Sequence, residues 1–247
     1  MRRLGFAVLL VVAMIATGFA RETNAPPSTG GKLVFDPTSA YREQKIQGWR
    51  VLVNEKLLAE TNLCARTLQL LDAQLAQITH ELPVAPLQRL REIPVWVERS
   101  SQQFSCMCYH ESHEWLRTHG VNPEKTGGVE LANPEKFLTW TKDQPWMVLH
   151  ELAHGYHQRH LGEGHSGIKR CFEAAKAAGK YDAVLRISGR TERHYALNNE
   201  KEYFAEATEA FFGKNDFYPF VRAELKQFDP EMFALLCRVW EMPDAGK

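Results

Sequence analysis

The sequence predicts an α+β fold, because short strand-like segments occupy its first half and helical periodicities dominate the second. The chain has 247 residues, enough for one domain with a sizeable core. Hydrophobic residues make up 44% and charged residues 24%, which argues against a disordered chain or a coiled coil. Its 30 basic and 30 acidic residues balance, so the charge does not point to nucleic acid or an anionic membrane surface.

The N-terminal residues predict a targeting segment. Arg2 and Arg3 precede an apolar run over residues 4–16, and Gly18-Phe-Ala20 has the small residues of a cleavage site. The run is too short to span a bilayer comfortably. We therefore expect residues 1–20 to be a removed signal peptide, with the mature protein secreted or periplasmic and not stably inserted in a membrane. Residues 21–46 are rich in Pro, Ser, Thr, Gly and charge and predict a flexible leader before a domain over residues 47–247.

Four short strands and one long helix are expected in the first half. Apolar residues recur at helical spacing over residues 60–82. Alternating or β-branched residues predict strands at 49–53, 93–97, 103–109 and 127–132. The second of these is expected to start after Pro94.

Helices are expected to dominate the second half. Asp143 predicts an N-cap with Pro145 in the first turn, and the helix should run to about His160 and end near Gly162. Further helices are predicted at 166–178, at 199–212 and at 219–240, the last interrupted near Pro230, with a hairpin over 181–197.

The first of these helices carries the motif HExxH, from His150 to His154. Residues four apart lie on one helix face, so both imidazoles can reach one ion. Glu151 is rotated by about 100° from His150 and lies where it can act on a water bound to that ion. The motif therefore predicts a Zn²⁺ site held by His150 and His154, with Glu151 as the general base.

A catalytic zinc needs a third protein ligand, usually with water in the fourth place. His160 stands ten residues after His150, but that spacing works only with a glycine at position 157, where this chain has His157. On a continuous helix His160 would point away from the ion. His157 lies on the face of the ligand pair, and both a supporting and a packing role remain open for it.

The helix at 199–212 offers a better ligand. Glu202, Glu206 and Glu209 fall within about 60° of one another on a helix whose other positions are mostly apolar or small. Such a stripe without lysine or arginine partners suggests buried carboxylates that face a cation. Glu202 is expected to bind zinc, and Glu206 to accept the free N–H of a ligand histidine. Glu209 could share that second role or be solvated.

These residues resemble a known family. HExxH followed about fifty residues later by a helical glutamate resembles the gluzincin metallopeptidases, and Asn199-Glu-Lys-Glu-Tyr-Phe-Ala-Glu206 resembles an element in the catalytic domain of anthrax lethal factor and its relatives. The resemblance covers roughly residues 145–215. It implies a zincin-like fold, with a small mixed sheet, an active-site helix and a mainly helical C-terminal half. It also implies Glu202 as the third ligand and Tyr195, seven residues earlier, as a stabiliser of the transition state, although packing in a hairpin would equally explain a tyrosine there.

The expected function is a secreted zinc metallopeptidase that hydrolyses peptide or protein substrates with a zinc-activated water. The strand at 127–132 is expected to be the sheet edge to which an extended substrate adds. Two alternatives remain open: a zincin-fold binding protein without catalysis, and a zinc amidase acting on non-peptide or cell-wall amides.

The cysteines and a second histidine segment give weaker signals. Export would permit disulfides, but the odd number of cysteines leaves at least one unpaired within the chain, and Cys106-Met-Cys108 is too short for an easy internal bridge. The pairing cannot be read from the five positions Cys64, Cys106, Cys108, Cys171 and Cys237. His110 and His113 could share a metal, but no third ligand is evident, and a polar loop or helix start is expected there.

Overall fold

The computed structural model describes residues 35–243. The expected signal peptide and most of the expected leader lie outside this range. The leader prediction is wrong for residues 41–46, because they form strand β1 (Tyr41–Ile46), which pairs antiparallel along its whole length with β2 (Trp49–Asn54). Within the described residues, no helix is long and apolar enough to cross a membrane.

The centre of the first half is a five-stranded mixed sheet in the order β1-β2-β3-β5-β4. Strands β2, β3 (Val95–Val97) and β5 (Val129–Leu131) are parallel, whereas β4 (Met107–Tyr109) is antiparallel to β5. All four predicted strands are therefore present, and β3 begins directly after Pro94. The expectation that residues 127–132 form the sheet edge is wrong, because β5 lies between β3 and β4, and β4 is the edge.

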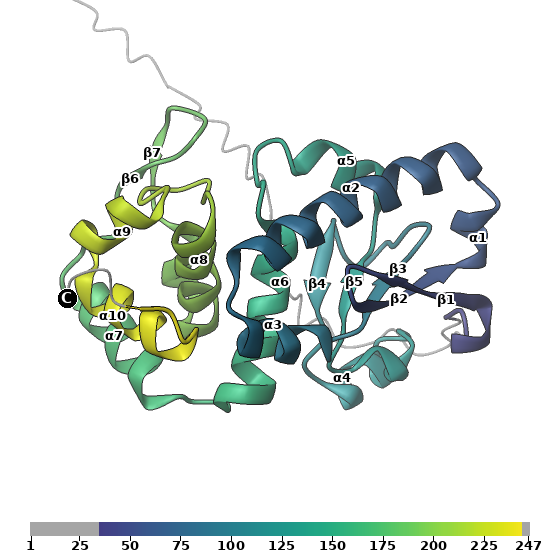
Figure 1. Cartoon of the computed structure of the whole chain (residues 1–247), viewed down its shortest axis with the longest axis horizontal. Helices are drawn as coiled ribbons and strands as arrows, with labels where there is room; N and C mark the ends of the chain where they lie inside the picture. Colours follow the sequence, from purple (N-terminus) through teal and green to yellow (C-terminus); the bar gives the residue numbers. More distant parts are fainter. Residues whose placement is uncertain (1–34, 244–247) are drawn as a thin grey trace, which may run out of the picture.

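One face of the sheet carries the main hydrophobic core. Val51, Val95 and Val129 lie in one row across the strands and are fully buried. The long helix α2 (Thr61–Glu81) crosses this face (Figure 1) and is the helix predicted at 60–82. Each such buried side chain contributes about 1.5–3 kcal/mol, so this face anchors the fold. Shorter helices flank it: α1 (Glu55–Leu58), α3 (Val84–Arg91) and α5 (Pro134–Trp140). Helix α4 (His113–Thr118) instead packs beside the 3₁₀ turn η2 (Pro123–Lys125).

The opposite face is more polar. The neighbouring row of the sheet consists of Leu52, Trp96, Glu130 and Cys108, each paired with the next across the strands. Because side chains alternate along a strand, this row faces away from α2. Only Leu52 and Trp96 of the row join a small apolar cluster, together with Tyr41.

Helix α6 (Met147–Tyr156) lies between the sheet and the second half of the chain (Figure 1). Its N-cap is Trp146, without a side-chain hydrogen bond, so the predicted cap at Asp143 is wrong. Asp143 instead belongs to a preceding turn, where its N–H donates to the Trp140 carbonyl. The helix continues as a π-helical turn over His157–Leu161 and ends at Gly162, whose φ of 86° suits glycine, as predicted.

The second half is mainly helical, which confirms the α+β prediction. Its helices are α7 (Ser166–Ala177), α8 (Glu200–Phe212), α9 (Arg222–Phe228) and α10 (Pro230–Val239). The predicted hairpin is shorter than expected, with strands β6 (Val184–Leu185) and β7 (Thr191–Glu192), because Tyr195–Asn198 form a 3₁₀ turn, η4.

Candidate metal centre

Two helices bring the expected ligands together. Helix α6 carries His150 and His154 one turn apart, and α8 packs against it. The Asn199 side chain caps α8 by accepting from the N–H groups of Lys201 and Glu202, both at 2.9 Å. This cap fixes the start of the helix, so Glu202 lies in the first turn facing α6.

The donor atoms of these three residues converge. Glu202 Oε2 lies 3.1 Å from His150 Nε2 and 3.4 Å from His154 Nε2. A tetrahedral ion with bonds of about 2.1 Å holds its ligand atoms about 3.4 Å apart. The side chains are 12%, 11% and 18% exposed for His150, His154 and Glu202, so the centre is sheltered but open to solvent. The donor types and their spacing fit zinc.

The electrostatics of the centre favour a positive charge. Burial raises the pKa of Glu202, but the charge of His154 and the hydrogen bonds with both histidines outweigh it and hold that pKa well below its usual range. Burial lowers the pKa of His150, but its contacts with Glu202 and Glu209 raise it well above the ordinary value. Glu202 is therefore an ionised carboxylate in a site that stabilises a proton or a cation.

The carboxylate nearest to His150 Nδ1 is that of Glu209. Its Oε1 lies 2.7 Å from His150 Nδ1, whereas Glu206 Oε1 lies 3.7 Å from the same nitrogen. The sequence predicts this contact for Glu206 and leaves Glu209 open as the alternative, and in the structure Glu209 makes the hydrogen bond. Burial raises the pKa of both carboxyls, and for Glu206 the neighbouring charges of Glu209 and Asp216 raise it further.

Glu151 and Tyr195 both lie close to the expected ligands. Glu151 is half-buried on α6, and its charge raises the pKa of the Cys106 thiol and of the Tyr195 phenol beyond the effect of burial. Tyr195 is half-buried at the start of η4. Burial, and then the charge of Glu202, raise the pKa of its phenol, so Tyr195 remains neutral beside this expected ligand.

The other two histidines of α6 and its π-helical turn lie apart from the three donors. His157 is buried against the Phe204 ring at a centroid distance of 5.3 Å, and burial lowers its pKa to about 4. His160 Nε2 lies 3.8 Å from Glu92 Oε2, on the side of α3. Within residues 35–243 neither histidine joins a group of converging metal donors.

The cysteines of the described chain do not form the bridges that export would permit. Cys64, Cys106, Cys108 and Cys171 are thiols without a disulfide partner among residues 35–243. Cys106 Sγ donates to Met147 Sδ at 3.5 Å, inside the main core.

Comparison with known proteins leaves the family open. The sequence matches no protein-family model, and it matches no curated protein. Among solved structures, the chain is similar to the Pro-Pro endopeptidase PPEP-2 from Paenibacillus alvei, with 16% sequence identity and a TM-score of 0.43 over 79% of this chain and 99% of that one. A TM-score this low assigns neither a family nor a reaction, so the functional conclusion depends on the geometry of the site.

Proposed function

We propose that the chain is a secreted or periplasmic zinc metallopeptidase of the gluzincin type. The observation that carries the proposal is the position of Glu202 Oε2, at 3.1 and 3.4 Å from the Nε2 atoms of His150 and His154. Two imidazoles and one carboxylate are the ligand set of many catalytic zinc sites, with one place left open for water. His150, His154 and Glu202 would hold the ion, and Glu209 would fix the ring of His150.

Zinc, when bound, would supply Lewis-acid chemistry, lowering the pKa of a water ligand toward neutrality and polarising a carbonyl. Glu151 takes a proton from the attacking water and passes it to the leaving amine. Its place on α6, one residue after His150 and near enough to Tyr195 for its charge to act on that phenol, suits a base that acts at the metal centre.

Tyr195 is the proposed donor to the oxyanion. Its raised pKa keeps the phenol protonated, so the hydroxyl can donate a hydrogen bond to the oxygen on which negative charge develops. Its position in the field of Glu202 supports this role over packing alone.

The substrate is proposed to be a peptide or protein that extends along β4. Among the described residues, β4 pairs only with β5 and forms one edge of the sheet. Tyr109, the last residue of β4, donates a hydrogen bond to Gln158 in the turn that follows α6. An extended peptide added to such an edge gains main-chain hydrogen bonds and lies beside the metal centre.

The test compares zinc-loaded wild type with Glu151→Gln on a broad peptide library read by mass spectrometry. We expect the wild type to cleave peptides and the variant to lose cleavage while His150, His154 and Glu202 still bind zinc. Glu163→Gln, at an exposed position after Gly162, is the matched control and should retain activity.

Full activity in Glu151→Gln would overturn the mechanism. A zinc-loaded wild type that is inert on peptides would overturn the proposed reaction. Cleavage of non-peptide amides would then identify an amidase, and no cleavage of either class would identify a binding protein.

A further inference from the structure

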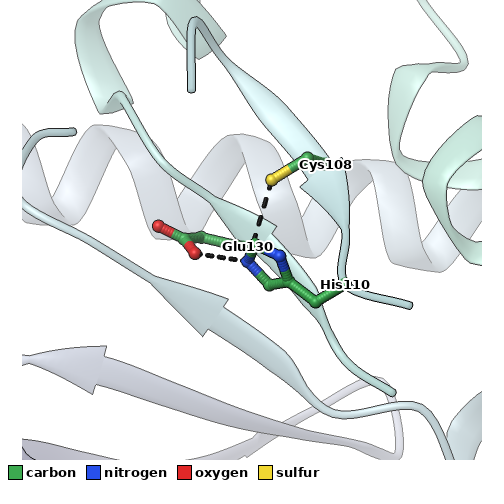
Figure 2. A group of neighbouring side chains, drawn as sticks. All are labelled: Cys108, His110 and Glu130. Atoms are coloured by element: carbon green, nitrogen blue, oxygen red, sulfur yellow. Dashed lines mark hydrogen bonds and ion pairs between the residues drawn. The ribbon is translucent and has the colours of Figure 1, made fainter. Parts of the chain in front are cut away.

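A second group of potential metal donors lies on the face of the sheet that points away from α2 and α6. It consists of Cys108, His110 and Glu130 (Figure 2). Cys108 on β4 is directly opposite Glu130 on β5. His110 follows two residues after Cys108, and its N–H donates to the Gly128 carbonyl, so strand geometry continues and its side chain lies on the same face.

The three donors are close together and sheltered. His110 Nε2 lies 2.5 Å from Glu130 Oε2 and 3.8 Å from Cys108 Sγ, and all three donor atoms lie within 4.8 Å of one another. His110 and Glu130 are 4% and 2% exposed, and Cys108 is half-buried. A thiol, an imidazole and a carboxylate are donor types that zinc and similar ions prefer. The 2.5 Å between His110 Nε2 and Glu130 Oε2 is a hydrogen-bond distance, so these two atoms would move apart to about 3.4 Å around a tetrahedral ion.

With His110 neutral, the charges around this group leave one negative charge without a cation. Lys125, 3% exposed, forms ion pairs with both Glu98 and Glu130, the latter at 3.1 Å. Two buried carboxylates therefore share one ammonium. Buried charge without a partner is costly, so a further cation is favoured beside Glu130. A divalent ion bound to a Cys108 thiolate adds one net positive charge, which balances the excess.

We propose that Cys108 Sγ, His110 Nε2 and Glu130 Oε2 form a second zinc site, separate from the one on α6 and α8. Binding replaces the thiol proton of Cys108 by the metal and releases that proton to solvent, with no change of oxidation state. His110 binds as the neutral imidazole, and Lys125 stays paired with Glu98. Because Cys108 and His110 belong to β4 and the segment after it, and Glu130 to β5, the metal clamps the edge strand onto the sheet. The site does not depend on catalysis at the first centre.

A metal-free arrangement could balance the same charge if His110 were protonated and donated to Glu130. The two states differ at Cys108, which is a thiolate only in the metal-bound state. A spectroscopic signature of a metal–sulfur bond therefore separates them.

The test loads the purified chain with Co²⁺ in place of zinc and records its absorption spectrum. The ligands of the first centre are nitrogen and oxygen, so only the second site can give a sulfur-to-cobalt charge-transfer band. We expect this band in the wild type, in His154→Ala and in Cys106→Ser, and its loss in Cys108→Ser. Bound metal should fall from two equivalents per chain to one in Cys108→Ser and in His110→Ala.

Cys106→Ser is the matched control, because Cys106 lies two residues away but points into the main core. A wild-type spectrum without the band overturns the proposal whatever the variants do, and leaves the imidazolium arrangement. A band that survives in Cys108→Ser overturns it equally, because another thiol must then bind the metal. Circular dichroism of each variant shows whether the loss of the band reflects the site or the fold.

Discussion

Glu209 Oε1 lies 2.7 Å from His150 Nδ1, on the side of the imidazole ring opposite to Glu202. With a metal ion on Nε2, this contact would hold the remaining proton of His150 on Nδ1. A buried carboxylate on α8 thereby contacts a proposed ligand on α6, so the packing of the two helices sets the spacing of these side chains.

Removing this contact should weaken metal binding. Glu209→Ala is expected to lower the affinity for zinc by about 10–100-fold, because the ring of His150 loses its orienting acceptor. Competition with a chromophoric chelator measures the affinity. Glu206→Ala is the control on the same helix, and its effect should be smaller because Glu206 lies 3.7 Å from Nδ1. Equal losses in the two variants would contradict the assignment.

Tyr195→Phe should affect turnover rather than metal binding. Without the phenol hydroxyl the oxyanion loses a donor, and kcat should fall about 100-fold with KM and zinc content nearly unchanged. Steady-state kinetics on a cleaved peptide, together with metal analysis, test this. Tyr109→Phe removes a hydroxyl that donates to Gln158 and should leave kcat within a few-fold. A Tyr195→Phe variant with the kcat of the wild type would assign this tyrosine to packing.

His157 should make the fold more stable at neutral than at acidic pH. Burial, and then the charge of His154, lower its pKa from 6.5 to about 4, so between these values the unfolded chain binds more protons than the folded one. The free energy of unfolding therefore rises with pH across this window, by at most about 1.4 kcal/mol per pH unit from this group. The contribution of neutral His157 to the free energy of unfolding is fully present above pH 6.5 and is lost as the pH falls toward 4.

Urea unfolding of the metal-free chain between pH 4.5 and 7 measures this slope, and His157→Phe should reduce it. His80→Phe is the control, because the His80 side chain is 85% exposed and its replacement should leave the slope unchanged. An unchanged slope in His157→Phe would mean that this histidine titrates normally in the fold.

Gly213 permits a close approach between the end of α8 and the start of α6. A Cβ atom built at Gly213 would lie 1.8 Å from a ring carbon of Trp146, well inside contact distance. Gly213→Ala should therefore cost about 1–3 kcal/mol in the free energy of unfolding, measured as a lower Tm. The exposed neighbour Lys214→Ala should change stability little. If adding Trp146→Leu restores the Tm of Gly213→Ala, the clash with the Trp146 ring is the cause of the lost stability. An unchanged Tm in Gly213→Ala alone would contradict this packing.

Regular periodicity made much of the fold predictable. The long α2 and the capped α8 follow from apolar spacing and from Asn199, because both signals are local in the sequence. The sequence of β1 favours a leader because Arg42, Glu43, Gln44 and Lys45 are polar, and in the fold these four side chains are exposed. The start of α6 was misplaced because Asp143 resembles a cap, whereas a turn precedes the helix.

The site was predictable only as far as a single helix determines it. The spacing of His150 and His154, and the acidic stripe of α8, follow from the helical repeat. The choice between Glu206 and Glu209 depends on the angle at which α8 packs on α6, which a single helix does not encode. The group of Cys108, His110 and Glu130 depends on the register of β4 and β5, so the sequence alone left His110 without a third ligand.

The most direct test of the account is anomalous diffraction at the zinc absorption edge from crystals of the zinc-loaded chain. The account predicts a peak between α6 and α8, about 2.0–2.2 Å from His150 Nε2, His154 Nε2 and a Glu202 carboxylate oxygen. The absence of a peak there, or a peak in which His160 replaces Glu202, would contradict it.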